Sequence, residues 1–202
     1  MATAITPKTV AAITAGPGVT DGVTGIANAY AEGLPVLAIT GETSTYIFGR
    51  GGLQESAGEG GAVDQVALFR GITRYAKLVE RTDYLGQVLA QATQALFAET
   101  PGPVLLSLPY NLQKELVDLE LLKQVRTQRP PRAPHHQGPL IERLAELMEQ
   151  AERPVIVGGY GVLRAGARRQ VRALSEGWNI PVTSSLKGKG AIDERSPLSL
   201  GS

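Results

Sequence analysis

Residues 11–42 read AAITAGPGVTDGVTGIANAYAEGLPVLAITGE, and their pattern indicates the fold class of the chain. It holds two apolar runs, at residues 10–15 and 36–40, which we predict to be buried strands. Between them, residues 20–32 carry apolar side chains at helical spacing, so we expect a helix there. Strands that are apolar throughout and are joined by helices indicate a parallel sheet that is covered on both faces.

The same alternation of strands and helices continues to about residue 110. Downstream of residue 40 we predict, in chain order, a glycine-rich loop (41–62), a short helix (63–69), a strand or extended segment (72–78), an amphipathic helix capped by Asp83 and a buried strand (104–108). Thr20 or Asp21 is expected to cap the first helix of the chain, and Asp83 the amphipathic helix.

The composition changes after this α/β region. Residues 126–139 are rich in proline and poor in apolar side chains, which is typical of a linker. We therefore predict three parts: an α/β domain at residues 1–115, a linker at 116–138 and a second domain at 139–202.

The second domain is expected to be an incomplete Rossmann-like unit. It has an amphipathic helix with Leu140 and Leu144 on one face, strands at residues 154–157 and 182–184, and a helix at 167–178. That last helix is expected to bury Val171, Leu174 and Trp178. Two or three strands make a poor sheet, so we expect this domain to be cut short.

Composition excludes several functions. The net charge of the 202-residue chain is +1, which gives no electrostatic case for nucleic acid or an anionic membrane. No cysteine is present, and the two histidines, His135 and His136, are neighbours in the proline-rich stretch, so no metal site is predicted. We find no signal peptide and no run long enough to span a membrane, and we expect a cytoplasmic protein.

Glycine-rich turns are the candidate binding sites. The turn Gly16-Pro17-Gly18 lies between a strand and a helix, where backbone amides can bind a ligand. The alternative, which the motif alone favours, is a tight structural turn between strand and helix. A glycine-rich stretch precedes Gln54 and Glu55. These two side chains could contact a ligand or could simply be exposed to solvent.

Two further turns lie in the second domain. The turn at residues 158–161 could lie against a nucleotide, but Arg164 stands where the dinucleotide-binding pattern needs a glycine, and a plain crossover is an equal alternative. Lys187 and Lys189, each beside a glycine, could clamp an anion or belong to a solvated loop.

The order of these motifs resembles the thiamine-diphosphate-dependent enzymes of the acetolactate synthase superfamily. The stretch at residues 11–42 is similar to the core of that family's pyrimidine-binding domain. Later segments with the same resemblance are LQE (53–55), ALFRGITRYA (67–76), PGPVLLSLP (101–109), RPVIVGGYGVLRAGARRQVRAL (153–174) and IPVTSSLKGKGAIDERSPLSLG (180–201), the last two being similar to the start of the family's central domain.

The resemblance implies the fold and a set of site residues. It implies a pyrimidine-binding domain with a parallel sheet, followed by the start of a Rossmann-like central domain. Pro17, Gly18 and Asp21 match the turn that faces the pyrimidine of the cofactor, with Asp21 in place of the family's usual Asn, and Gln54 matches a glutamine near the reacting carbon. Residues matching positions near FAD or an adenine nucleotide in some members are Gly159, Gly161 and Arg164.

The departures from the family pattern bear on activity. The family's activating glutamate precedes the GPG turn, yet no acidic residue precedes Asp21, and the GDG…N motif that binds diphosphate and Mg²⁺ does not occur. We therefore predict no catalytic and no metal-binding residue in this chain. The loop at residues 56–62 is also longer than in acetolactate synthase.

The predicted function is a fragment of a thiamine-diphosphate enzyme that makes or breaks C–C bonds of 2-oxo acids, as a transferase or lyase, inactive alone. We expect it to form a homo-oligomer or to associate with a complementary or full-length subunit. The alternatives are a non-catalytic partner subunit and a module that binds FAD or ADP.

Overall fold

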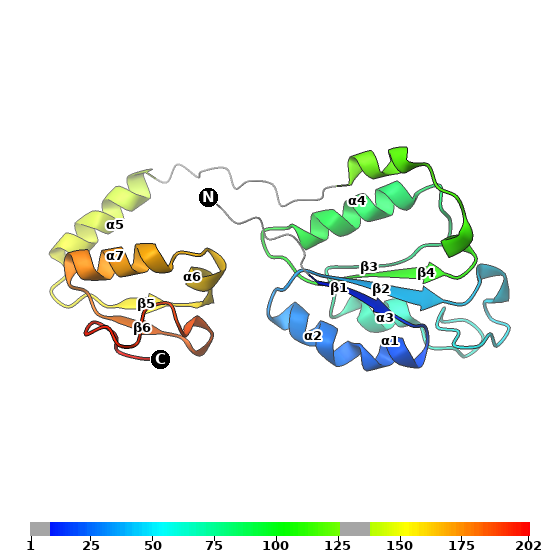
Figure 1. Ribbon diagram of the computed structural model, residues 1–202, viewed down its shortest axis with the longest axis horizontal. Coiled ribbons are helices and arrows are strands. Elements are labelled where there is room, and N and C mark those ends of the chain that lie inside the picture. The colour runs from blue at the N-terminus through cyan, green and yellow to red at the C-terminus, as the bar shows by residue number, and fades with distance from the viewer. Residues whose placement is uncertain (1–8, 126–137) are drawn as a thin grey trace. The chain divides into compact units, whose positions relative to one another are not determined.

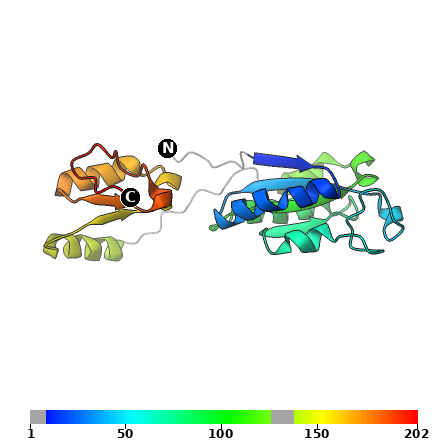
Figure 2. The same cartoon turned by 90° about the horizontal axis from the view of Figure 1, so that it is seen from below.

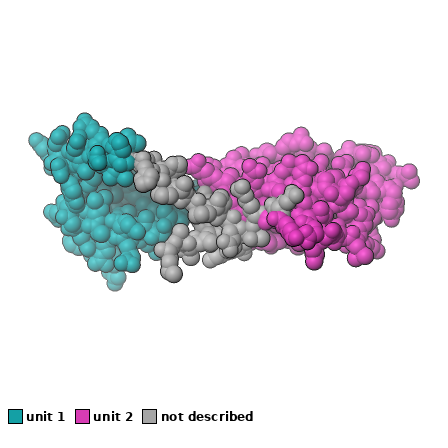
Figure 3. Space-filling view, turned by 90° about the horizontal axis from the view of Figure 1, so that it is seen from above, with its two compact units in different colours: residues 1–2, 132–202 teal, residues 3–131 magenta. Residues whose placement is uncertain are grey.

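The computed structural model describes residues 9–125 and 138–202 of the chain. These residues form two compact units, which Figure 3 shows in different colours. No helix within the described ranges is long and apolar enough to cross a membrane.

The first unit is built on a four-stranded sheet. Its strands are β1 (Thr9–Ile13), β2 (Val36–Glu42), β3 (Tyr75–Leu78) and β4 (Val104–Pro109). They lie in the order β1-β2-β4-β3, and every pair is parallel. The predicted fold class, an α/β unit with a parallel sheet, is confirmed.

Helices cover both faces of this sheet (Figure 1). They are α1 (Pro17–Asp21), α2 (Val23–Ala31), α3 (Gln65–Arg70) and α4 (Leu85–Leu96). Along β4, Val104 and Leu106 pack with α4, whereas Leu105 packs with Val19 of α1 and Phe69 of α3. This alternation gives the unit two apolar cores, one on each side of the sheet.

The predicted helix at residues 20–32 is wrong in its start and in its caps. The helical backbone begins at Pro17, whose ring fixes a φ suited to the first turn, and it is divided by Gly22 into α1 and α2. Neither helix has a side-chain cap, and the Thr20 hydroxyl donates to the carbonyl of Pro17 at 2.9 Å.

The first strand also differs from the prediction. It ends at Ile13 rather than at residue 15, and it is largely exposed, with Val10 59% accessible. The reason is its position at the edge of the sheet, where in the described part of the chain it pairs with β2 alone. The apolar run therefore predicted the presence of a strand correctly but its burial wrongly.

The segment after β4 is more ordered than a linker. Residues Leu119–Gln124 form a 3₁₀ turn, η3, which packs on α4 so closely that a β-carbon on Gly86 would lie 2.9 Å from the carbonyl oxygen of Leu121. The start of α4 differs too, because Tyr84 precedes it and Asp83 forms an ion pair with Arg81 instead of capping it. The core of the predicted linker, with His135 and His136, lies outside the described residues.

The second unit has a two-stranded parallel sheet. Its elements are α5 (Gly138–Gln150), β5 (Ile156–Gly158), α6 (Tyr160–Arg164), α7 (Arg168–Trp178) and β6 (Val182–Ser184). Leu174 and Trp178 are 38% and 45% exposed, so their predicted burial is wrong. A sheet of two strands has too little area to cover the whole apolar face of α7.

The remaining elements are short 3₁₀ turns: η1 (Thr45–Ile47), η2 (Leu112–Lys114) and η4 (Leu186–Gly188). Figure 2 shows the helices and strands of each unit from a second direction. The domain boundaries at residues 115/116 and 138/139 stay a prediction.

Candidate functional site

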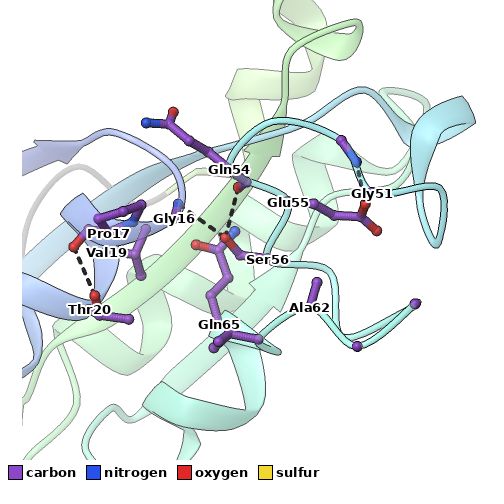
Figure 4. Close-up of a pocket in the computed structure, with 14 residues that line it drawn as sticks. Gly16, Pro17, Val19, Thr20, Gly51, Gln54, Glu55, Ser56, Ala62 and Gln65 are labelled. Carbon is purple, nitrogen blue, oxygen red and sulfur yellow. Dashed lines mark hydrogen bonds between the residues drawn. The ribbon is translucent and has the colours of Figure 1, made fainter.

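A cavity of about 490 Å³ lies at the carboxyl ends of β1 and β2. Its walls come from the Gly16–Pro17 turn with α1, from the glycine-rich loop between β2 and α3, and from Gln65 at the start of α3 (Figure 4). In open parallel sheets, ligands bind in crevices at this end of the strands.

The Gly16 turn requires glycine. Its φ is +63°, and a β-carbon there would lie 2.9 Å from the β-carbon of Gln54. The backbone N–H of Gly16 donates to the Ser56 hydroxyl oxygen at 3.0 Å, and that hydroxyl donates to the carbonyl of Gln54 at 3.1 Å. The turn and the glycine-rich loop are thus held against each other.

Hydrogen bonds to the Glu55 carboxylate stabilise part of the glycine-rich loop. Glu55 accepts hydrogen bonds from the backbone N–H groups of Gly49 and Gly52, the second at 2.9 Å. A β-carbon on Gly60 would lie 2.7 Å from the carbonyl oxygen of Gly49, so two glycine-rich stretches touch. Glycine here permits backbone to pack directly on backbone.

A buried carboxylate lies behind the cavity. Glu42, the last residue of β2, is only 3% exposed. One of its oxygens accepts from the backbone N–H of Thr43 at 2.8 Å and of Ser56 at 2.9 Å, and the other accepts from the Gln65 amide nitrogen at 2.7 Å. Glu42 therefore joins β2, the glycine-rich loop and α3.

Burial raises the pKa of the Glu42 carboxyl above its ordinary value of 4.5. The hydrogen bonds from Ser56, Thr43 and Gln65 oppose this shift because they favour the charged form, and the nearby charge of Glu55 adds to it.

Gln65 completes this buried group and is 1% exposed. Its amide nitrogen also lies 2.7 Å from the Ser107 hydroxyl oxygen and 3.2 Å from the Gly41 carbonyl oxygen. Its amide oxygen has no hydrogen-bond partner among the described residues, and the same holds for the buried Thr40 hydroxyl.

The predicted cofactor residues of the first unit fall in different places. Pro17 and Gln54 line the cavity. Gly18 packs beneath the turn, where a β-carbon would lie 2.5 Å from a methyl carbon of Thr14. Asp21 is exposed at the end of α1, outside the cavity lining.

The predicted nucleotide residues belong to the second unit. Gly159 precedes α6, Gly161 is its second residue and Arg164 its last. The tightest contact at this turn is internal: a β-carbon on Gly188 would lie 2.2 Å from the Gly158 carbonyl oxygen. Lys189, half of the predicted anion clamp, pairs with Glu194 at 3.4 Å. Packing thus accounts for Gly188, and an ion pair for Lys189.

Glu42, Ser56 and Gln65 were not among the site residues predicted from the sequence. A polar residue ending an apolar strand was the one signal for Glu42. Ser56 and Gln65 meet it from positions 14 and 23 residues further along the chain, and spacing of that kind carries no periodic signal. No group of three or more His, Asp or Glu side chains suited to a metal occurs in residues 9–125 or 138–202.

Two family models match the chain. Residues 3–68 match the thiamine pyrophosphate enzyme N-terminal TPP binding domain, and residues 141–202 match the thiamine pyrophosphate enzyme central domain. The two models lie in the two units of the structure, the first of them over the whole cavity.

Relatives named acetolactate synthase match nearly the whole chain. A probable acetolactate synthase large subunit of Methanocaldococcus jannaschii is 36% identical over 191 residues, which cover 93% of this chain and 31% of that protein. The acetolactate synthase of Arthrospira platensis is 34% identical over 93% of this chain and 32% of its own length. The isozyme 3 large subunit of Escherichia coli is 31% identical over 94% and 32%. The chain therefore spans about a third of these relatives.

Proposed function

The chain belongs to the thiamine pyrophosphate enzymes, and from that premise we propose that its cavity binds the aminopyrimidine half of thiamine diphosphate. The proposal rests on the place of the cavity, which lies at the carboxyl end of the sheet. Gly16, which is hydrogen-bonded to Ser56, lines it together with Ser56 and Gln65. That is the end at which parallel sheets bind ligands.

The residues present fit one end of the cofactor. A cavity of about 490 Å³ suits a small heterocycle, and its wall at Gly16 admits no side chain. The described residues offer no cluster of acidic groups for Mg²⁺, which the diphosphate end would need. We infer that diphosphate and Mg²⁺ are bound by another chain or segment.

The reaction class follows from the relatives. We propose that the intact assembly makes or breaks C–C bonds of 2-oxo acids, as a transferase or lyase of the acetolactate synthase kind. The cofactor supplies the electron sink for such chemistry, whereas the protein supplies binding and orientation. This chain's own part is to hold the pyrimidine ring between α1 and the glycine-rich loop.

We propose that the chain alone does not catalyse. Glu42 is buried with both oxygens hydrogen-bonded and does not line the cavity, and both oxygens of Glu55 accept from main-chain N–H groups, so we assign neither as the acid that activates the cofactor. Association with a full-length or complementary subunit, or with a second copy, would supply the missing acid. Binding of FAD at Gly159, Gly161 and Arg164, and a cytoplasmic location, stay predictions.

Calorimetry with thiamine and with thiamine diphosphate plus Mg²⁺ tests this function. We expect weak binding of both, about millimolar, with affinities within about threefold of each other, because the chain grips the pyrimidine and not the diphosphate. No acetolactate should form from pyruvate. Binding of the diphosphate form more than about tenfold tighter would show that this chain holds the diphosphate too, and turnover of pyruvate would contradict the need for a partner.

A further inference from the structure

A layer of polar side chains is buried beneath the cavity. Thr40 and Ser107 are register partners on β2 and β4, so their side chains point to the same face of the sheet, and both are fully buried. Glu42 and Gln65 complete the layer on the side of α1 and α3. Buried polar atoms nearly always have partners, so an unpartnered one calls for an explanation.

The orientation of the Gln65 amide is fixed by its neighbours. The Glu42 carboxylate and the Gly41 carbonyl can only accept hydrogen bonds, at 2.7 and 3.2 Å, so the amide group facing them must be the NH₂. Turning the amide over would place its oxygen against a carboxylate oxygen. The amide oxygen is therefore the free end of Gln65.

The free oxygen belongs to a residue of the cavity wall. Gln65 lines the cavity together with Val19 of α1 and Ser56. Figure 4 shows its side chain rising toward Gly16 and Ser56, with the amide beside them. The oxygen is closed to water in this structure, so a ligand reaches it only when the adjoining wall moves slightly. That wall includes Gly60 and Gly61, which carry no side chain.

We propose that Gln65 is a positioning residue that accepts a hydrogen bond, through its amide oxygen, from the amino group of a bound aminopyrimidine. Glu42 and Ser107 hold the amide in the accepting orientation. The inference rests on the proposed function, since it names the residue that selects an amino donor over an acceptor at the same ring position.

The test compares thiamine with oxythiamine, in which an oxo group replaces the pyrimidine amino group. Ligand-observed NMR titrations of the full chain give both dissociation constants. We expect thiamine to bind about tenfold more tightly than oxythiamine, because the oxo group would face an acceptor. Gln65→Met should reduce that ratio to about one, and so should Gln65→Asn, which withdraws the amide by one methylene. Gln94→Met, on the exposed part of α4, is the control and should leave the ratio unchanged.

The outcomes separate the two proposals. A ratio near one in the wild-type chain, with thiamine still bound, overturns the role of Gln65 and leaves the pyrimidine site standing. A wild-type ratio near ten that survives both Gln65 variants also overturns it. Failure of the wild type to bind either compound overturns the proposed function and the inference with it. The wild-type ratio needs no variant, so the test holds even if Gln65→Met does not fold.

Discussion

Single residues set the geometry of the cavity. Gly16 has a left-handed backbone and touches Gln54, which is itself at a φ of 58° although it is not glycine. A non-glycine residue with a left-handed backbone is uncommon, and this conformation costs a free energy of order 1–3 kcal/mol. Contacts with the surrounding structure must therefore stabilise it. Those contacts are the Ser56 hydrogen bonds to Gly16 and Gln54.

Gly16→Ala is expected to destabilise the first unit by about 1–3 kcal/mol, because the new β-carbon meets both a positive φ and the Gln54 side chain. Thiamine binding should weaken as well. Gly25→Ala is the control: Gly25 lies inside α2 with open space around it, so the change should stabilise by about 0.5–1 kcal/mol. Urea unfolding measures both, and equal effects of the two variants would contradict the account.

Glu42→Gln tests the buried carboxylate. Because burial raises the pKa of Glu42 in the folded chain, ionisation of this group costs folding free energy, and that cost appears as the pH rises from its ordinary value of 4.5 through the raised pKa. Glutamine cannot ionise, and its oxygen can still accept from Ser56 and Thr43. Its NH₂ would face the Gln65 NH₂, a cost that does not change with pH. The variant should therefore gain stability relative to the wild type across that window. Unfolding free energies measured over a pH series check this, and a difference that is constant with pH would contradict it.

At the scale of elements, the strands were the easiest part to predict. Apolar runs bounded by glycine and proline located β2 and β4 correctly, because both are central strands, β4 buried on both faces and β2 buried on one and partly buried on the other. The same rule overestimated the burial of β1, since an edge strand and a central strand can share one apolar pattern. The predicted side-chain caps were wrong for different reasons: Asp83 pairs with Arg81, whereas Thr20 and Asp21 lie inside α1, which begins earlier, at Pro17.

The segment after β4 shows what local composition cannot reveal. Residues from 116 onward carry mixed polar and apolar side chains, and we predicted a linker there. The packing of η3 depends on Gly86, which is 35 residues away from Leu121 in the sequence. A contact of that separation leaves no periodic trace in either segment.

Leu121→Asp is expected to cost the first unit about 1–3 kcal/mol, because it places a charge in the half-buried contact between η3 and α4. Leu119→Asp is the matched control: Leu119 is 74% exposed on the same turn, so its replacement should change stability by less than about 0.5 kcal/mol. Urea unfolding of both variants gives the comparison. Similar costs would show that η3 is not docked as described.

At the scale of the whole molecule, the family could be predicted and the site only in part. The order of glycine turns and strands identified the pyrimidine-binding and central domains, and both family models agree. The cavity wall and the buried polar layer behind it bring together Gly16, Glu42, Ser56, Gln65 and Ser107 from separate segments. Pro17 and Gln54 could be predicted from the sequence because they lie in motifs shared with the family. The buried polar layer could not, because folding brings its residues together from separate segments.

An aminopyrimidine bound at the Gly16 turn would perturb the backbone around the cavity of the first unit, and a thiamine titration of the full chain followed by ¹⁵N–¹H NMR detects this. We predict shifts of the backbone amides of Gly16, Ser56, Gly60 and Gly61, which line the cavity, with the turn at residues 158–161 unchanged. Shifts confined to residues 158–161, or none in the first unit, would contradict binding at the Gly16 turn.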